Sequence, residues 1–443
     1  MGSDYVKRKI GSLGRVVTGK TPPTSDSSNF GGQYPFITIP DLNGRVFIDC
    51  AERTLSDKGA KLLRSCLLPP GAVMMSCIAT VGKCGITTKP SFTNQQINSV
   101  IPSDDVDSRF LYYLFTQIGH ELESAGGGGS VYTNVSKSRF SDIEIIFPAD
   151  LNEQRAISHI LGTLDDKIEL NRQMNQTLEE MARAIFKSWF VDFDPVRAKV
   201  AVRREHPDWS NAQVSQAACP NLKPEIAELF PDEFENSELG EIPKGWRVGK
   251  IDDVGDNPRR GVQPANIQPG TPYIALEHMP KRCVTLSDWG VADDLESNKF
   301  EFKMGEILFG KLRPYFHKVG IAPVDGVCST DIVVVAPKST VWFGFVLGHV
   351  SSAEFVEYTN AGSTGTKMPR TSWAEMARYK IVLPPQAVAR AFTERLQPFV
   401  DRIIAAVHES RTLAALRDTL LPKLISGKLS VKDAERFLKE RGL

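Results

Sequence analysis

The sequence predicts an α+β protein built from two similar halves, and three observations carry this prediction. The chain has 443 residues, about three times the length of a typical domain, so two or more folded units are expected. One sequence pattern occurs twice, about 240 residues apart. Apolar residues recur at intervals of three and four after Pro148 and again after Pro384. The predicted fold is therefore two pseudo-repeated α/β domains separated by two long helices that form an antiparallel coiled coil.

The internal repeat keeps the same order of features in both halves. An aromatic residue, basic residues and Lys-Ile come first, followed by β-like runs, a Gly-Ile pair and a final β-like run that ends in proline. The matching segments are 5–14 and 246–255, 34–37 and 271–274, 70–76 and 304–310, 85–86 and 320–321, 96–102 and 331–337, and 143–148 and 379–384. Because short β runs alternate with turn residues, each half is expected to contain a strongly curved sheet.

The helix expected after each half has an apolar seam with coiled-coil spacing. The first seam is Leu161, Leu164, Ile168, Asn171, Asn175, Leu178, Ala182 and Ile185. The second is Phe392, Leu396, Phe399, Ile403, Ala406, Ser410, Leu413, Arg417, Leu420 and Leu424. Polar residues at seam positions usually fix register at some cost in stability. The two seams can pair with each other, or each helix can pack on its own domain, because both arrangements fit the spacing.

These features divide the chain into five segments. The two domains are expected at 1–148 and 241–385, and the two helical regions at 149–190 and 386–443. Between the first helix and the second domain, 191–240 is rich in Pro, Asp and Glu. This segment is expected to be a structured linker with short helices at most.

Composition excludes several classes of protein. With 41% hydrophobic residues, the chain has enough apolar surface to fold. The 53 Lys and Arg residues balance 53 Asp and Glu residues, so local basic patches must hold any polyanion and a histone-like binder is excluded. Seven widely spaced cysteines without a Cys-x-x-Cys pair predict reduced thiols and a cytoplasmic location. Neither a signal peptide nor a membrane span is expected.

Residues 14–21 match G-x-x-x-x-G-K-[ST] in form, but Pro22 and Pro23 follow at once. A phosphate cradle must run directly into a helix whose N–H groups face the phosphate, and these prolines remove two donors. The segment is therefore interpreted as a basic surface loop. The seven histidines lack metal-ligand spacing, and neither a nucleotide fingerprint nor the Asn-Pro-Pro-aromatic motif of amino-methyltransferases is found. No catalytic residue and no metal ligand is predicted.

Basic, amide and aromatic side chains gather instead in matched loops of both halves. Arg and Lys hold phosphates or read guanine, and Gln and Asn can bond adenine. The candidate DNA-binding residues of the first half are Lys20, Thr21, Thr80, Lys83, Gln95, Gln96, Tyr132 and Asn134. Those of the second half are Arg259, Arg260, Lys311, Arg313, Tyr315, His317, Lys318, Lys367 and Arg370. Any single loop also fits a solvated β-turn. However, if one scaffold carries two different DNA-reading surfaces, the loops should recur at matching positions of both halves but with different residues.

The chain resembles the specificity subunits of type I restriction-modification systems. The resemblance lies in the segments 148–188, which includes PADLNEQRAISHIL, 230–246 (FPDEFENSELGEIPKGW) and 420–427 (LLPKLISG), with Thr-Gly-Lys-Thr-Pro at 18–22. These segments cover both ends and the middle of the chain. The second helical region departs from the family at 384–390 (PPQAVAR), where the family often has Pro-x-x-Glu-Gln.

The resemblance implies a non-catalytic subunit whose two target-recognition domains each read one half of a split double-stranded DNA sequence. It also implies that the paired helices set the gap between the half-sites and dock two methylation subunits, with restriction (translocase and endonuclease) subunits joining later. S-adenosylmethionine, ATP and magnesium are expected on those partners, with no cofactor in this chain. The alternatives are a stand-alone bipartite DNA-binding regulator or nucleoid protein, and a P-loop ATPase.

Overall fold

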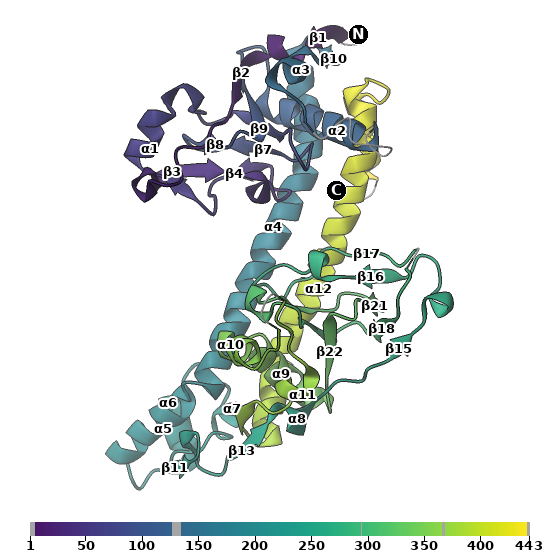
Figure 1. The fold of residues 1–443 in the computed structure, drawn as a ribbon. Coiled ribbons are helices and arrows are strands. Elements are labelled where there is room, and N and C mark those ends of the chain that lie inside the picture. The colour runs from purple at the N-terminus through teal and green to yellow at the C-terminus, as the bar shows by residue number, and fades with distance from the viewer. Residues whose placement is uncertain (1–4, 126–133, 294, 366–367, 441–443) are drawn as a thin grey trace. The chain divides into compact units, whose positions relative to one another are not determined.

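The computed structural model describes residues 5–125, 134–293, 295–365 and 368–440 (Figure 1). It combines helices with several small sheets, which confirms the predicted α+β class. The chain divides into two compact units, Met1–Leu170 with Thr412–Leu443, and Asn171–Arg411. Two 40-residue helices, α4 (Leu151–Phe190) and α12 (Gln386–Ile425), each contribute one part to each unit.

The first unit is built around a five-stranded sheet with the order β2-β9-β6-β7-β4. These strands are β2 (Gly14–Thr18), β9 (Ile97–Pro102), β6 (Val73–Ser76), β7 (Cys84–Thr87) and β4 (Phe47–Ile48). A three-stranded sheet contains β5 (Thr54–Leu55), β3 (Phe30–Ile37) and β8 (Phe92–Thr93), and β1 (Tyr5–Lys9) pairs with β10 (Glu144–Pro148). The shorter helices are α1 (Asp57–Leu62), α2 (Ser108–Ala125), α3 (Lys137–Asp142) and α13 (Val431–Lys439).

The second unit contains a four-stranded sheet with the order β14-β22-β19-β20 and a five-stranded sheet with the order β15-β18-β21-β16-β17. The first comprises β14 (Gly255–Asp256), β22 (Ile332–Pro337), β19 (Ile307–Gly310) and β20 (Val319–Ile321). The second comprises β15 (Gly261–Val262), β18 (Lys299–Phe302), β21 (Gly326–Cys328), β16 (Pro272–Ile274) and β17 (Gly290–Val291). β13 (Arg247–Lys250) pairs with β23 (Lys380–Leu383), and the helices are α8 (Ile251–Val254), α9 (Phe343–Val350), α10 (Ala353–Ala361) and α11 (Trp373–Met376).

The repeat seen in the sequence is also a repeat of strand pairing. The order β2-β9-β6-β7 of the first unit recurs as β14-β22-β19-β20 in the second. In both units the central pair is antiparallel, with Val73 opposite Val100 and Ile307 opposite Val335. A parallel pair also recurs, β3 with β8 and β16 with β21. The matched segments therefore form equivalent strands.

Both long helices have ends that their sequence explains. At the start of α4, the Asp150 carboxylate accepts a hydrogen bond from the Asn152 N–H (2.9 Å), which satisfies a free helix donor. α12 begins directly after Pro384 and Pro385, where a missing N–H costs little. After α12 ends, Gly427 adopts φ +69°, the left-handed conformation common just beyond a helix.

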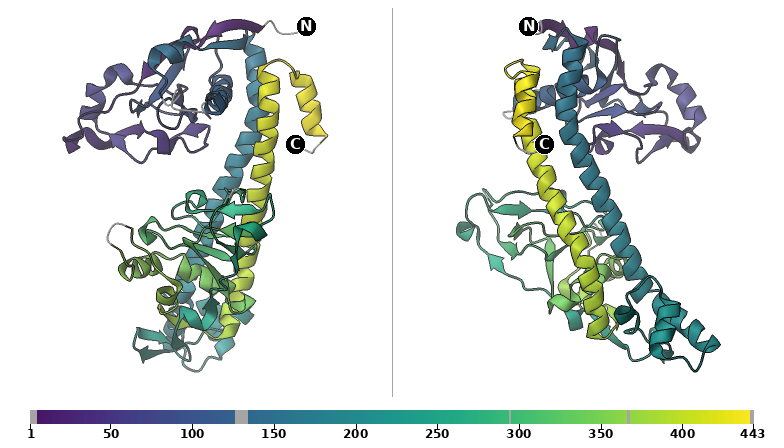
Figure 2. Two further views of the ribbon diagram at one scale, coloured as in Figure 1. Left: turned by 45° about the vertical axis from the view of Figure 1, so that its right-hand side comes forward. Right: turned by 180° about the vertical axis from the view of Figure 1, so that it is seen from behind.

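Within each unit, α4 and α12 contact each other and also pack on the domain. In the first unit, α4 and α12 lie side by side (Figure 2). There, Leu161 and Leu164 of α4 share an apolar cluster with Leu420 of α12 and Phe110 of the domain. In the second unit, the Asn171 Nδ2 donates to Glu409 Oε2 (2.9 Å) and Ser410 Oγ (3.2 Å). Phe186 and Phe392 lie against each other further along, with ring centroids 6.1 Å apart. Residue numbers rise along α4 as they fall along α12, so the contacting stretches within each unit are antiparallel.

Segment 191–240 contains more regular structure than the short helices expected. It forms the 12-residue helix α5 (Asp194–Glu205), α6 (Asn211–Ala218), α7 (Pro224–Ala227) and the strand β11 (Phe234–Ser237), which pairs with β12 (Gly240–Pro243). Pro195 and Pro224 lie in the first turns of α5 and α7, where proline favours helix initiation instead of interrupting a helix. The fully buried Lys199 donates to Asn211 Oδ1 (2.8 Å) and to the carbonyls of Ala227 and Phe230 (3.2 and 2.5 Å). This lysine therefore holds α5, α6 and α7 together.

Candidate nucleic-acid interface

The candidate loops of the first half lie together at one end of the β2-β9-β6-β7 sheet. The N–H groups of Gly19 and Lys20 donate to the carbonyls of Ile97 (3.1 Å) and Thr93 (3.0 Å), which joins the end of β2 to the turn between β8 and β9. The Cys77 N–H donates to the Gln96 carbonyl (2.8 Å), which adds the β6–β7 loop to the same surface. A Cβ on Gly19 would come within 2.4 Å of atoms of Thr93 and Asn94, so this glycine permits close backbone approach.

Most of the predicted side chains on this surface are exposed. They are Lys20, Thr21, Thr80, Lys83, Gln95 and Asn134, whereas Gln96 is half-buried. The Thr21 hydroxyl donates to Gln95 Oε1 (2.7 Å), and Gln96 Oε1 accepts a hydrogen bond from the Asn94 side chain (3.0 Å). Tyr132 and Lys367 lie outside the described residues.

The segment that matches a P-loop is a strand followed by an irregular loop. Gly14–Thr18 is β2, and the next helical turn is the short 3-10 helix Ser27–Asn29. No helix N-terminus therefore follows Lys20 and Thr21, as Pro22 and Pro23 predict.

The buried side chain of Ser76 shapes the β6–β7 loop. Its hydroxyl donates to the Thr80 carbonyl (2.5 Å) and accepts from the Lys83 N–H (2.9 Å). The backbone of Ser76 closes the loop by donating to the Lys83 carbonyl (2.8 Å). Lys83 and Thr80 are thus held by their backbones, which leaves their exposed side chains free to meet a ligand.

The equivalent loop of the second half, 310–318, is held by the same set of backbone hydrogen bonds, which forms the frame of the loop. The Gly310 N–H donates to the Lys318 carbonyl (2.8 Å), as that of Ser76 does to Lys83. The Lys311 N–H donates to the Asp331 carbonyl (2.9 Å), as that of Cys77 does to Gln96.

A neighbouring segment completes the frame in both halves. The Lys311 carbonyl accepts from the Thr371 N–H (3.0 Å), as the Cys77 carbonyl does from Val135 (2.8 Å). An isolated bridge joins Leu312 to Arg370 in the second half, and Ile78 to Asn134 in the first.

The next position of the frame has a left-handed backbone in both halves. Arg313 has φ +51° and its counterpart Ala79 has φ +66°. The Arg313 N–H donates to the Pro369 carbonyl (2.7 Å), and its guanidinium carbon lies 6.0 Å from the centre of the Phe316 ring. Its buried Nε has no hydrogen-bond partner among the described residues. Arg313 is therefore a restrained arginine where the first half has only a methyl group.

Two predicted residues of this loop are engaged by the protein itself. The His317 Nε2 lies 2.9 Å from the Ser351 carbonyl, and the Lys318 Nζ donates to the Leu276 carbonyl (2.5 Å). Burial lowers the pKa of both His317 and Lys318. Tyr315, by contrast, is 49% exposed beside them.

Arg260 lies away from the other predicted residues of the second half. It forms an ion pair with Glu306, the residue before β19, whereas Lys311 and Arg313 follow the opposite end of that strand. The reason is that β14 pairs with β22 over two residues only, while β2 pairs with β9 over five. The chain then leaves the sheet and enters β15. The adjacent Arg259 is exposed with φ +44°, so the matched loop at 254–261 does not join the surface at 311–318 as its counterpart does.

Two basic residues near the second loop were absent from the predicted set. The exposed Lys281 lies with its Nζ 4.8 Å from the centre of the Phe316 ring, and the Arg282 N–H donates to the His317 carbonyl (2.8 Å). The segment at 281–282 has no counterpart in the repeat. Only the presence of two adjacent basic residues in the sequence could have indicated it as part of this surface.

Nothing in the described ranges resembles a metal site, since they contain no group of three His, Cys, Asp or Glu side chains able to hold an ion. The helices of those ranges also include none long and apolar enough to cross a membrane. The described residues of the first loop surface instead present cations and amides, and those of the second present cations and the Tyr315 ring, each on a backbone closed by hydrogen bonds. Such groups can hold phosphates and hydrogen-bond the edges of bases.

Comparisons with known proteins point the same way. Residues 2–180 match the type I restriction modification DNA specificity domain. The chain is 28% identical to the type I restriction enzyme MjaIX specificity subunit of Methanocaldococcus jannaschii, over 97% of this chain and 94% of that protein. It is 24% identical to the EcoDI specificity subunit of Escherichia coli, over 97% and 89% of the two chains.

A shorter sequence match and a solved structure complete the comparisons. The HindI specificity subunit of Haemophilus influenzae is 38% identical over 37% of each chain. A type I restriction-modification S subunit from M. genitalium aligns with 95% of this chain and 96% of its own, at 13% identity and a TM-score of 0.49. Along nearly its whole length, the chain is therefore similar in sequence to type I restriction enzyme specificity subunits.

Proposed function

We propose that this chain is the DNA specificity subunit of a type I restriction-modification complex and reads a bipartite target, one half-site with each recognition domain. The observation that carries the proposal is the shared loop frame. The same backbone hydrogen bonds and bridge hold Cys77 and Ile78 in one half and Lys311 and Leu312 in the other, and Ala79 and Arg313 share a left-handed backbone. One scaffold with two sets of side chains suits two different half-sites. The relatives favour this function over a stand-alone DNA-binding regulator.

The two long helices would act as the spacer between the recognition domains. In this proposal they form an antiparallel coiled coil, supported by the contact of Asn171 with Ser410 in one unit and by the shared cluster of Leu161 and Leu420 in the other. The same helices would offer a docking surface for two methylation subunits, which restriction subunits join later.

The chain would contribute recognition and no chemistry of its own. S-adenosylmethionine, ATP and magnesium would be bound by the partner subunits. The strand and irregular loop at 14–26 support this view, because they lack the helix N-terminus that holds a nucleotide phosphate.

The experiment that tests the proposal is methylome sequencing of a host that expresses this chain together with its methylation subunit. A split methylated sequence with a fixed spacer is expected, and both half-sites should disappear when this chain is omitted. The purified chain should hydrolyse no ATP. Turnover by the isolated chain that Lys20→Ala abolishes would instead support the P-loop ATPase.

A further inference from the structure

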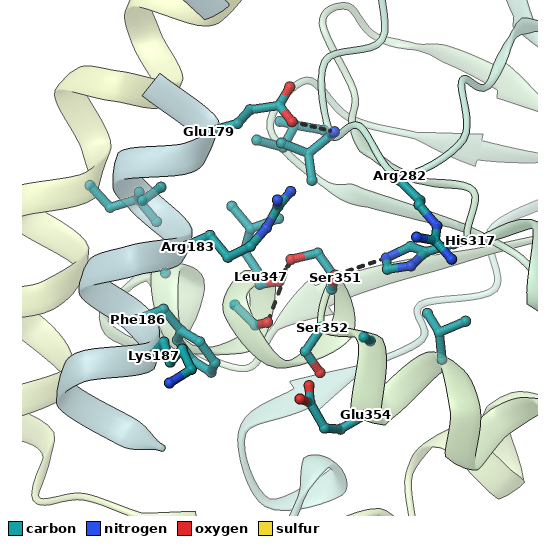
Figure 3. A pocket seen from close by; sticks show the side chains of 18 of the residues that line it. Glu179, Arg183, Phe186, Lys187, Arg282, His317, Leu347, Ser351, Ser352 and Glu354 are labelled. Carbon is teal, nitrogen blue, oxygen red and sulfur yellow. Dashed lines mark hydrogen bonds between the residues drawn. The ribbon is translucent and has the colours of Figure 1, made fainter. Parts of the chain in front are cut away.

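A pocket of about 640 Å³ lies inside the second unit, beside the second loop surface (Figure 3). Its walls come from α4, from α9 and the start of α10, from α12, and from the loops at 282–284 and 315–317. Two glycines of α9 bring these walls together. A Cβ on Gly348 would come within 2.1 Å of the Phe186 ring, and one on Gly344 within 3.0 Å of Phe392. The pocket is therefore a feature of how α9 packs on both long helices.

The floor of the pocket is apolar. It is lined by Phe186, Leu347, Phe392, Leu396, Val400 and Ile403, each at most 5% exposed. A cavity with such a floor favours an apolar or aromatic side chain, because burying that side chain removes apolar surface from water. A phosphate group would lose its hydration there without gaining a partner.

The mouth of the pocket carries positive charge on one side. Arg183 of α4 and Arg282 of the facing loop are exposed, and neither guanidinium group has a hydrogen-bond or ion-pair partner among the residues that the structure describes. Figure 3 shows Arg282 beside His317, with Arg183 extending from α4 toward the same opening. Burial lowers the pKa of His317, and the charges of Arg282 and Arg183 lower it further. The two arginines thus create a local positive potential at the mouth.

Three acidic residues, Glu179, Glu354 and Glu357, also line the pocket, and among the described residues none of them forms an ion pair with Arg183 or Arg282. The Glu179 carboxylate accepts hydrogen bonds from the backbone of Val284 (3.0 Å) and Thr285 (2.9 Å). Glu354 lies on α10, and Figure 3 shows it near Ser352, away from Arg183 and Arg282. Lys187, the other cation of α4 at the mouth, is already paired with Asp192.

From this geometry we propose that the pocket docks a segment of a partner protein, one that places an apolar or aromatic anchor on the floor and a carboxylate between Arg183 and Arg282. The inference rests on the proposed function, since that function supplies a partner in the form of the methylation subunit. An apolar floor with arginines at its rim has the make-up of a protein interface hot spot. It does not suit a DNA backbone, which would use the arginines and leave the floor empty.

The test is assembly of the chain with its methylation subunit, measured by titration with size-exclusion mass as the readout. The double variant Arg183→Glu, Arg282→Glu should weaken assembly at least about tenfold, because it places two acids opposite a carboxylate. Ala353→Trp, which covers the mouth from an exposed position of α10, should weaken assembly in the same way. Arg64→Glu is the matched control, since this arginine is exposed, lies outside both long helices and does not line the pocket. It should assemble as the wild type does.

DNA affinity of the isolated chain separates the remaining outcomes. It should be unchanged in Ala353→Trp and in the control variant, which leave both arginines in place. Loss of DNA affinity with assembly intact would show that the arginines hold phosphate, and unchanged assembly in both pocket variants would show that the pocket docks no partner; either result overturns the inference. If the wild-type chain itself does not bind a methylation subunit, the proposed function fails, and this outcome is distinct from failure of the pocket variants alone.

Discussion

Arg313 is the residue that most clearly distinguishes the two loop surfaces. It occupies the left-handed position that Ala79 occupies in the first half, so Arg313→Ala should leave the loop backbone in place. If this arginine reads a base, its loss should cost roughly 1–3 kcal/mol of binding free energy and relax one position of one half-site. If it holds a phosphate, all sequences should weaken equally. Binding to a panel of single-base variants measures the difference, and unchanged affinity would remove this loop from the interface.

His349 makes the stability of the second unit depend on pH. Its ring lies 4.9 Å from that of Phe186 and 4.6 Å from that of Phe345, and its Nε2 has no hydrogen-bond partner within the described residues. Burial lowers its pKa from 6.5 to about 3. Below pH 6.5 the unfolded chain therefore binds a proton that the folded chain does not, and this histidine reduces stability as the pH falls toward 3.

The expected slope is about 1.4 kcal/mol per pH unit between pH 6 and pH 4, and His349→Phe should remove it. Urea unfolding followed by tryptophan fluorescence can measure this effect. All six tryptophans lie in the second unit, so the signal reports that unit. The exposed His120, changed to Gln, is a control that should keep the wild-type slope. An unchanged slope in His349→Phe would show that another group titrates.

Among the elements, α4 and α12 are joined by a buried polar network in the first unit. The Asp165 carboxylate accepts from the Tyr113 hydroxyl and from Arg417 Nη1, both at 2.6 Å. Burial raises the pKa of Tyr113, and the Asp165 charge raises it further. Because the Asp165 side chain is only 6% exposed, Asp165→Asn should cost about 3 kcal/mol of unfolding free energy.

The next residue along the helix provides a control for that change. Asp166 pairs with Arg109, but its side chain is 62% exposed, so Asp166→Asn should cost less than about 1 kcal/mol. Denaturant unfolding followed by circular dichroism would measure both losses. Equal losses would mean that burial does not distinguish the two carboxylates.

If the two long helices are the spacer, their length should set the number of base pairs between the two half-sites. One heptad inserted into each helix, between Asn171 and Leu178 and between Val407 and Leu413, adds about 10 Å of rise and keeps the seam in phase. The preferred DNA spacer should lengthen by about three base pairs with both half-sites unchanged. A heptad in one helix alone should disrupt pairing. A methylome with the original spacer after the double insertion would show that the helices do not set it.

For the whole molecule, recognition should be modular. Exchanging 1–148 for the first recognition domain of another specificity subunit should change one half-site only, because each domain is followed by its own long helix. Methylome sequencing of the chimera reads both half-sites at once. If both half-sites change, the model of two independent readers is wrong.

Much of this architecture can be read from the sequence. The repeat, its β runs and the two long helices follow from local patterns, since helix and strand periodicity depend on neighbouring residues. The prolines after Thr21 likewise exclude a phosphate-binding helix there. The repeat also implies that a strand pair formed in one half recurs in the other, as Val73 with Val100 and Ile307 with Val335 do.

Other features were decided only by tertiary structure. The bridges of Ile78 to Asn134 and of Leu312 to Arg370 join segments that only the completed sheet brings together. Arg260 forms an ion pair with Glu306, and the His317 Nε2 lies within hydrogen-bond distance of the Ser351 carbonyl. Both contacts arise because strand register and backbone conformation set the direction of each side chain. The pocket needs three helices and two loops that are distant in the sequence. The sequence by itself therefore determined the elements and their order, whereas long-range pairing and packing decided which side chains meet, because both depend on residues far apart in the chain.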